Sequence, residues 1–143
     1  MSGKTSGLGG AILVADSSQS AQTITNDVTN YQFSTPRAVQ DVTGVDKSAN
    51  ERILLLADYS VTLNGVFNYT SSPNSHEVFS TIPSTSVNRS VEIDPLGTTS
   101  GMPLLAVNCL LTDYQLTRAA TGELTWQVPG SLADGTPPAW STN

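Results

Sequence analysis

DVTGVDKSANERILLLADYSVTLNGVFN, residues 41–68, is the stretch that decides the fold of this chain. From Ile53 onward every second residue is apolar or small, and the residues between them become polar after Leu56. This period of two predicts an extended strand with one face on a core. The unbroken apolar run 53–56 predicts that the first part of the strand is covered on both faces, beneath a helix or a neighbouring subunit. Because strands usually have about five or six residues, we expect this one to extend beyond the body of its domain.

The composition indicates one domain that buries much of its surface against partners. A chain of 143 residues is long enough for one core and short for two. Charged residues make up 13% of the chain, about half the typical share, while Ser, Thr, Asn and Gly are abundant. A neutral polar surface of this kind is typical of protein contacts, where Lys and Glu are depleted. Composition alone leaves a secreted domain with an adhesive surface as an alternative.

The charges argue against tight binding of nucleic acid. Six Lys and Arg residues face twelve Asp and Glu residues, which gives a net charge of −6. A groove that grips phosphates needs clustered cations, and here the cations are scattered singly along the chain.

The single cysteine and the apolar runs limit the cellular context. Cys109 lies in an apolar strand pattern, and it is expected to be a buried small hydrophobe rather than a nucleophile. No apolar run reaches the length of a membrane span, and residues 1–10 lack the layout of a signal peptide. We therefore expect a soluble protein made in the cytoplasm, with no membrane partner.

The first third of the chain predicts a flexible arm followed by short strands. Residues 1–10 are rich in glycine and are expected to form a flexible N-terminal arm, while residues 11–143 form the domain. Residues 11–15 predict a short apolar strand or arm that docks on a neighbour. Residues 23–35 and 37–43 predict a hairpin that closes near Pro36.

The only helix predicted lies within residues 71–83. Asn74 as the N-cap, with Glu77 three residues later, matches a capping pattern, and Pro83 ends the helix. His76, in the first turn, is expected to be a surface residue.

The second half of the chain predicts further strands. Residues 85–94 alternate as a strand in which Arg89 has a possible ion-pair partner, and residues 104–117 predict a second long strand in the same sheet as the first. Residues 123–128 form a hairpin with that strand, and residues 129–143 are expected to be irregular apart from Trp140, which pins the tail. The fold class is therefore mainly β: a two-sheet sandwich or partly closed barrel with one short flanking α-helix, in which a bulge or bend is expected at Gly65.

Catalytic patterns are absent from the sequence. A nucleophile triad needs a base, and the one histidine lies at a helix start without a G-x-S-x-G turn. No spacing of side chains matches a metal site. Dispersed carboxylates leave a paired-carboxylate hydrolase open as a minor alternative. The sequence is read as that of a non-enzymatic protein without cofactor or metal.

The order of these segments resembles that of a known family. The DVTG connector, the charged loop, the strand ERILLLADYSVTLNGVFN and the closing TDYQLTRAATGELTW are similar to the major tail tube proteins of long-tailed, siphovirus-like bacteriophages, over residues 8–140. The resemblance implies a virion protein, assembled in the bacterial host cytoplasm, that self-assembles into stacked hexameric rings forming the tail tube, the conduit for DNA ejection. Its implied partners are other copies of itself, the tape measure protein, the tail terminator and DNA in transient passage.

The resemblance also implies roles for particular residues. The 23–43 hairpin would pair with neighbouring subunits, and the loop residues Asp46, Lys47 and Ser48 would make ring-to-ring contacts; a solvated turn is the alternative. Asp27, Asp41 and Asp58 lie on strands that would line the lumen. Six copies at −6 each give 6 × −6 = −36 per ring, and like charge would keep DNA off the wall within about 8 Å at physiological salt.

Two alternatives from other classes remain. The first is a monomeric carbohydrate-binding or adhesin-like β-sandwich that uses Tyr69, Trp126 and Trp140 as stacking platforms. The second is a phage head-tail completion or capsid decoration protein. A ring or tube in solution would favour the tail tube reading, and a stable 15 kDa monomer the first alternative.

Overall fold

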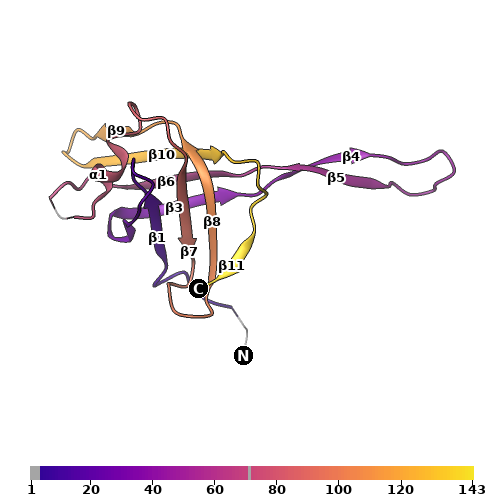
Figure 1. The fold of residues 1–143 in the computed structure, drawn as a ribbon, viewed down its shortest axis with the longest axis horizontal. Helices are drawn as coiled ribbons and strands as arrows, with labels where there is room; N and C mark the ends of the chain where they lie inside the picture. Colours follow the sequence, from indigo (N-terminus) through magenta and orange to yellow (C-terminus); the bar gives the residue numbers. More distant parts are fainter. Residues whose placement is uncertain (1–3, 71) are drawn as a thin grey trace.

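The structure, a computed structural model, describes residues 4–70 and 72–143 (Figure 1). Eleven strands and two short helices are assigned within these residues. In chain order they are β1 (Ala11–Ala15), β2 (Ala21–Thr23), the 3-10 helix η1 (Thr25–Asp27), β3 (Val28–Ser34), β4 (Arg37–Asp41), β5 (Arg52–Ala57), β6 (Ser60–Val66), α1 (Ser75–Phe79), β7 (Arg89–Asp94), β8 (Pro103–Leu111), β9 (Gln115–Arg118), β10 (Leu124–Leu132) and β11 (Trp140–Thr142).

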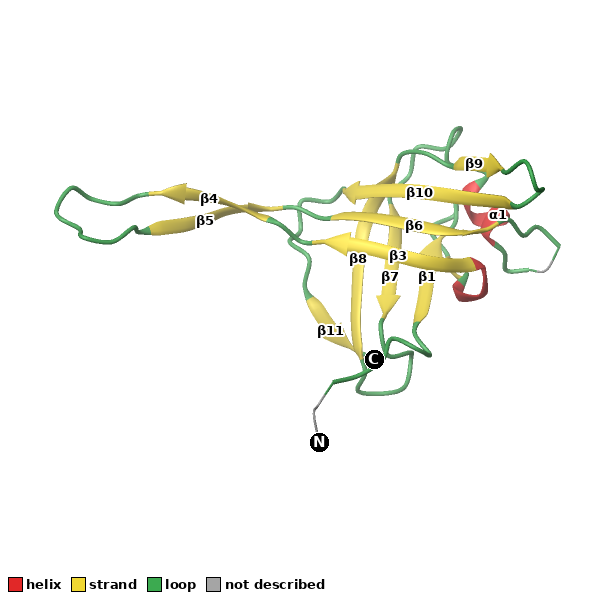
Figure 2. Ribbon diagram, turned by 180° about the vertical axis from the view of Figure 1, so that it is seen from behind, coloured by secondary structure: helices red, strands yellow, loops and turns green. Residues whose placement is uncertain are grey.

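One antiparallel sheet folds over to make both layers of the body. Its strand order is β2-β1-β7-β8-β10-β6-β3, with β11 also paired to β8 and β9 also paired to β10. Strand β8 joins the layers, because it pairs with β7 through residues 105–109 and with β10 through residues 109–111. Figure 2 shows β3, β6 and β10 crossing β1, β7 and β8 at a steep angle. The mainly β, two-layered fold with one short α-helix predicted from the sequence is confirmed.

The core lies between these layers and follows the period of two. In β6 the residues Val61, Leu63 and Gly65 point inward, and in β10 Trp126 and Val128 do so. Side chains of β1, β7 and β8 fill the space from the other layer. The strands that line the core therefore present one face to it and one face outward.

Gly65 is required where β6 pairs with β10, opposite Trp126. A Cβ at this position would lie 2.1 Å from the carbonyl oxygen of Asp27 and 2.3 Å from Cζ2 of Trp126. The indole N–H of Trp126 donates to the carbonyl of Val66 at 2.9 Å, which fixes the ring over the glycine. A bulge or bend was predicted at Gly65. The irregularity lies in the neighbouring strand β3, opposite Gly65, where the register shifts between Val28 and Asn30.

The helix forms where the capping pattern predicted, although it is short. The side chain of Asn74 accepts a hydrogen bond from the backbone N–H of Glu77 at 2.8 Å, and the helix ends at Phe79. Phe79 packs on Trp126 with ring centroids 4.9 Å apart. Because five residues gain little helical stability alone, this docking holds the helix in place. The first residue of the predicted segment, Ser71, lies outside the described residues.

Arg89 is buried beneath this helix, and its partners differ from the expected carboxylate. Its guanidinium donates to the carbonyl of Val78 at 2.6 Å and to the hydroxyl of Thr81 at 2.7 Å. Burial lowers the pKa of Arg89, and the nearby Asp16 acts in the opposite direction. Arg89 therefore ties β7 to the end of α1.

The single long strand predicted from Ile53 is wrong. The strand is interrupted at Asp58 and Tyr59, so that β5 and β6 are separate strands in different sheets. Tyr59 is buried, and the backbone N–H of Asp58 donates to the carbonyl of Pro36 at 2.9 Å.

The predicted hairpin that closes near Pro36 is also wrong. Strands β3 and β4 do not pair with each other, because β3 pairs with β6 and β4 pairs with β5. The four strands form one long hairpin that is interrupted at Pro36, and its closing loop is residues 42–51.

Three further expectations need correction. Strand β1 is paired on both sides inside the sheet, so it is not a docking arm. The second long strand is divided into β8 and β9, while the predicted hairpin with β10 is confirmed by the β9–β10 pairing. The tail contains β11, and Trp140 pins it by packing on Phe33 with ring centroids 5.9 Å apart.

The flexible arm over residues 1–10 stays a prediction, and residues 1–3 lie outside the described part of the chain.

Replacing Gly65 with alanine should destabilise the body. The new methyl group must displace backbone or the Trp126 ring, which costs about 3 kcal/mol in the free energy of unfolding. Urea unfolding followed by tryptophan fluorescence measures this change. The matched control is Gly7→Ala, where nothing lies within 4 Å of the new Cβ, and a change within about 0.5 kcal/mol is expected there. Equal effects of the two substitutions would contradict this role of Gly65.

Candidate functional site

The feature that distinguishes this molecule is a two-stranded hairpin that projects from the body. Figures 1 and 2 show β4 and β5 extending well beyond the layers, in line with β3 and β6. The two strands pair from Arg37 opposite Ala57, at the base, to Asp41 opposite Arg52, towards the tip. The hairpin is therefore an arm whose faces and edges are turned to the surroundings.

The described residues leave apolar side chains on this arm exposed. Leu56 is 86% exposed and Leu54 is 59% exposed, and Ile53 and Leu55 on the same strand are also exposed. Burial of one leucine side chain stabilises a protein by roughly 1.5–3 kcal/mol, and that stabilisation is forgone here. The complete set of exposed large apolar residues on the arm, here called the apolar arm surface, is Val39, Val42, Val45, Ile53, Leu54, Leu55 and Leu56.

The sequence predicted cover for residues 53–56 from a helix or from a neighbouring subunit. The helix is not the cover, because α1 packs on Trp126 in the body. The valines Val39, Val42 and Val45 were not identified from the sequence. Their signal was weak, since each is flanked by polar or small residues. The pairing of β4 with β5 is what brings them onto the same arm.

The arm is held in shape by its own polar groups. The Arg37 guanidinium donates twice to the carbonyl of Leu55, at 2.8 and 3.1 Å. Near the tip, Thr43 donates through its backbone N–H and its hydroxyl to Asp41, and these hydrogen bonds lower the pKa of that carboxyl group. The Thr43 hydroxyl also accepts from the backbone N–H of Glu51 at 2.8 Å. These contacts shape the arm without covering its apolar side chains.

The structure brings the predicted ring-contact residues to the tip of the arm. Asp46, Lys47 and Ser48 are all exposed, in a loop where the N–H of Lys47 donates to the carbonyl of Gly44. Their contact role stays a prediction.

The three aspartates predicted to line a lumen have different environments. Asp27 is 6% exposed and belongs to η1, and its carboxylate accepts from the backbone N–H of Ser75 at 2.8 Å and from the side chain of Asn68 at 3.0 Å. For Asp27 the lining prediction is wrong, because this carboxylate anchors the start of α1. Asp41 and Asp58 are exposed, near the tip and at the base of the arm, and their lining role stays a prediction.

The aromatic residues do not form one stacking platform. Trp126 is 2% exposed in the core, whereas Tyr69 and Trp140 are exposed. Because a sugar ring needs an accessible aromatic face, the proposed role of Trp126 in carbohydrate binding is wrong.

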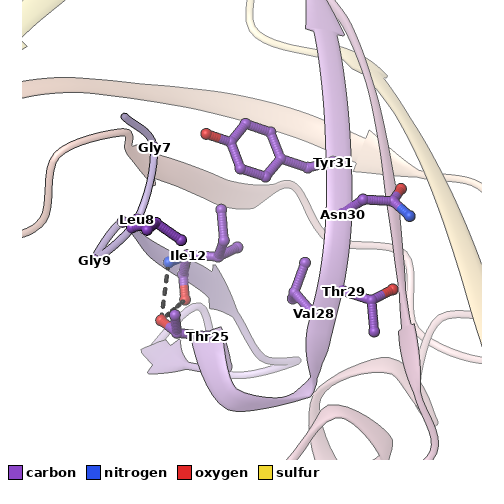
Figure 3. Close-up of a pocket in the computed structure, with 10 residues that line it drawn as sticks. Gly7, Leu8, Gly9, Ile12, Thr25, Val28, Thr29, Asn30 and Tyr31 are labelled. Carbon is purple, nitrogen blue, oxygen red and sulfur yellow. Dashed lines mark hydrogen bonds between the residues drawn. The ribbon is translucent and has the colours of Figure 1, made fainter. Parts of the chain in front are cut away.

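A hollow of about 400 Å³ lies between residues 7–10 and β3. Figure 3 shows Ile12, Val28 and Tyr31 around it, with the Thr25 hydroxyl accepting from the backbone N–H of Ile12 at 3.0 Å. Its lining carries no acid, histidine or cysteine that would support catalysis.

The side chains elsewhere that could take part in a reaction are buried or in contact with other side chains. The His76 ring packs against Phe67 in a tilted arrangement, and its Nδ1 lies 3.3 Å from the Tyr114 hydroxyl oxygen. Burial raises the pKa of the Cys109 thiol to about 12, which keeps it in its unreactive protonated form. Within residues 4–70 and 72–143, no three His, Cys, Asp or Glu side chains are grouped as a metal site would need. The described helices are all too short or too polar to cross a membrane.

Comparisons with known proteins place the fold. No family model and no curated protein matches the chain. The structure matches a chain of the virion of a native gene transfer agent particle at 18% identity and a TM-score of 0.66, covering 92% of this chain and 95% of that one. It matches a chain from the tail of an empty gene transfer agent particle, which has C6 symmetry, at 16% identity and a TM-score of 0.63, covering 93% and 95%. A chain of the sixfold-symmetrised baseplate of the anti-feeding prophage matches at 11% identity and a TM-score of 0.66, covering 99% and 97%. The chain thus has a phage tail tube-like fold.

Replacing Asp27 with alanine should destabilise the fold without touching the arm. The buried N–H of Ser75 loses its acceptor, which costs about 1–3 kcal/mol in the free energy of unfolding. Thermal unfolding followed by circular dichroism measures the loss. Asp46→Ala removes an exposed carboxylate and should change stability by no more than about 0.5 kcal/mol. If Asp27→Ala is as mild as Asp46→Ala, the anchoring role is wrong.

Proposed function

We propose that this chain is a structural subunit of a phage-like tail, which self-assembles into hexameric rings that stack into the tail tube and form a conduit for DNA. The observation that carries the proposal is the apolar arm surface. Soluble monomers seldom expose so many neighbouring large apolar side chains, and such patches mark contacts with other proteins. The fold is similar to those of chains from tail particles, one of which has C6 symmetry, and this similarity supports self-association in a symmetric assembly.

The partner of the arm is another copy of the same chain. A two-stranded ribbon is at best marginally stable alone, so a surface that covers it also stabilises it. In a closed ring every copy both supplies an arm and receives one, and no apolar surface is left over. The charged tip with Asp46, Lys47 and Ser48 would then reach the adjacent ring.

The body of the subunit suits ring closure through strand edges. The layer that runs from β3 through β6 and β10 to β9 is four strands wide, and β3 lies at the end of the strand order. Unpaired edges favour pairing with another chain. Six copies give about 24 strands, which at about 4.8 Å spacing make a circumference of ~115 Å and a diameter of ~37 Å between backbones. Strand tilt widens such a barrel further.

The remaining partners and the location follow from this role. The subunit would reside in the tail of the virion after assembly in the host bacterial cytoplasm. It would contact the tape measure protein and the tail terminator, and DNA only in transient passage. The protein would perform no catalysis, and its function would depend on assembly alone.

The test is the state of the purified chain in solution. Size-exclusion chromatography with light scattering, followed by negative-stain microscopy, should reveal rings or tubes with sixfold symmetry as concentration rises. A species that remains a 15.0 kDa monomer at every concentration would contradict self-assembly. Rings of another symmetry would contradict the hexamer alone.

The double substitution Leu54→Asp and Leu56→Asp should abolish assembly and leave the body folded. Both side chains are exposed in the single chain, so the free energy of unfolding should change by less than about 1 kcal/mol. In an interface, however, each would bury an unpaired carboxylate. The control is Ser84→Asp with Ser86→Asp, which adds the same charge at exposed positions after α1. Light scattering of both variants measures assembly, and tubes formed by the leucine variant would contradict the role of the arm.

Replacing residues 44–50 with two glycines should permit folding and ring closure while weakening stacking. This change removes the charged tip and leaves the β4–β5 pairing in place. Electron microscopy should then show single rings or short stacks. Tubes of the same length as those of the unchanged chain would contradict a ring-to-ring role for Asp46, Lys47 and Ser48.

A further inference from the structure

The carboxylate of Asp94, at the end of β7, is buried and incompletely paired. The residue is 0% exposed, although β7 ends there and a loop follows. Its Oδ2 atom has no hydrogen-bond partner within residues 4–70 and 72–143. Burial removes a carboxylate from its hydration and is costly unless another group compensates the charge. A ligand that supplies positive charge would therefore be stabilised beside Asp94.

A second carboxylate lies next to it. Glu92 and Asp94 are two positions apart on β7, so both lie on the face turned away from the core, whereas Val91 and Ile93 are buried in the core. Burial raises the pKa of the Glu92 carboxyl, and the hydrogen bond that its protonated form makes with Asp94 and the charge of Asp94 raise this pKa further. Two ionised carboxylates this close repel each other, and a cation between them removes the repulsion.

Three oxygen atoms converge on the side-chain amide of Asn143, beside this pair. Its Nδ2 atom lies 3.3 Å from the carbonyl oxygens of Gly97 and Met102 and 3.4 Å from Oδ1 of Asp94. These distances exceed the usual N–H···O distance of about 2.9–3.0 Å, and an NH₂ group has only two hydrogens to offer. The amide therefore satisfies this group of oxygens weakly.

The main chain holds these oxygens in position. The N–H of Gly97 donates to the carbonyl of Asp94 at 3.1 Å, in a turn where Gly97 has a φ of +95° that favours glycine. The backbone N–H of Asn143 donates to Met102, and its carbonyl accepts from Gly101, both at 2.9 Å. Figure 1 shows the C-terminus beside the loop that joins β7 and β8. The arrangement thus depends on backbone bonds between the end of the chain and this loop.

We propose that this corner of the body, between the end of β7 and the C-terminus, binds one calcium ion. The donors are all oxygens, and calcium accepts carboxylates, amide oxygens and main-chain carbonyls in flexible geometry. Its charge of +2 balances the two carboxylates, and a flip of the terminal amide presents its oxygen in place of its nitrogen. The ligands, here called the calcium site, are the side chains of Glu92, Asp94 and Asn143 and the carbonyls of Gly97 and Met102.

The sequence gave no sign of this site, because only two of its ligands are acidic and main-chain carbonyls have no sequence pattern. For the same reason it is not one of the groups of three acidic, histidine or cysteine side chains that other metals favour. A bound ion would tie β11 and the C-terminus to the loop after β7. This role goes beyond the proposed function and does not depend on assembly.

Calcium titration of the free subunit tests the site. The purified chain is freed of metal with a chelator and titrated with calcium chloride in a calorimeter, and magnesium chloride is the comparison. One calcium ion per chain should bind, and magnesium should bind at least ~tenfold more weakly because it demands a near-ideal octahedron. Calcium at about a hundred times its dissociation constant should raise the midpoint of thermal unfolding by at least ~4 °C.

Three substitutions of similar shape show whether these carboxylates are the ligands. Glu92→Gln should weaken calcium binding at least ~tenfold, and Asp94→Asn should abolish it, because affinity follows the charge of the ligands. The matched control is Asp113→Asn, which removes the same charge at an exposed position after β8. The control should bind calcium as the unchanged chain does.

Two results would overturn the inference. The first is the absence of calcium binding to the unchanged chain at millimolar concentrations. The second is an equal loss of binding in Glu92→Gln and Asp113→Asn, which would show a diffuse attraction of counterions. If Asp94→Asn does not fold, the half-buried Glu92 decides the test through its own variant. All these measurements use the free subunit, so a failure of tube assembly would be seen separately by light scattering.

Discussion

Uncovered apolar side chains on a thin projecting hairpin are the constraint on which the rest of this structure depends. The apolar arm surface exposes four consecutive residues, Ile53 to Leu56, on both faces of one strand. Water disfavours this arrangement by roughly 1.5–3 kcal/mol for each large side chain that stays uncovered. The subunit therefore gains most of its stability from the packed body. It is stabilised further when another surface covers the arm.

The junction between body and arm explains how one chain supports both. Tyr59 is fully buried immediately before β6 begins, where the body meets the arm, and the N–H of Asp58 donates to the carbonyl of Pro36 on the opposite strand of the hairpin. Beyond this point Arg37 braces the arm by donating to the carbonyl of Leu55. The strands thus keep one direction through the junction while their side chains pass from a packed core to open surroundings. The arm is positioned by the sheet with which it is continuous.

The sequence was sufficient for local features and insufficient for distant pairing. The period of two predicted β6, β8 and β10, and the Asn74 cap predicted the start of α1, because alternation and capping are local properties. Which strands pair is a non-local property, so the partners of β3 and β4 and the strand β11 in the tail were missed. Asp27 was misjudged for the same reason: its carboxylate is buried by Ser75 and Asn68, which lie more than 40 positions away.

The central claim is that another copy of the chain covers the apolar arm surface. Hydroxyl-radical footprinting with mass spectrometry measures the accessibility of individual leucine side chains, in the free subunit and in the assembled state. The account predicts that Leu54 and Leu56 are oxidised readily in the free subunit, where both are exposed, and at least tenfold more slowly after assembly. Equal oxidation rates in the two states would contradict it.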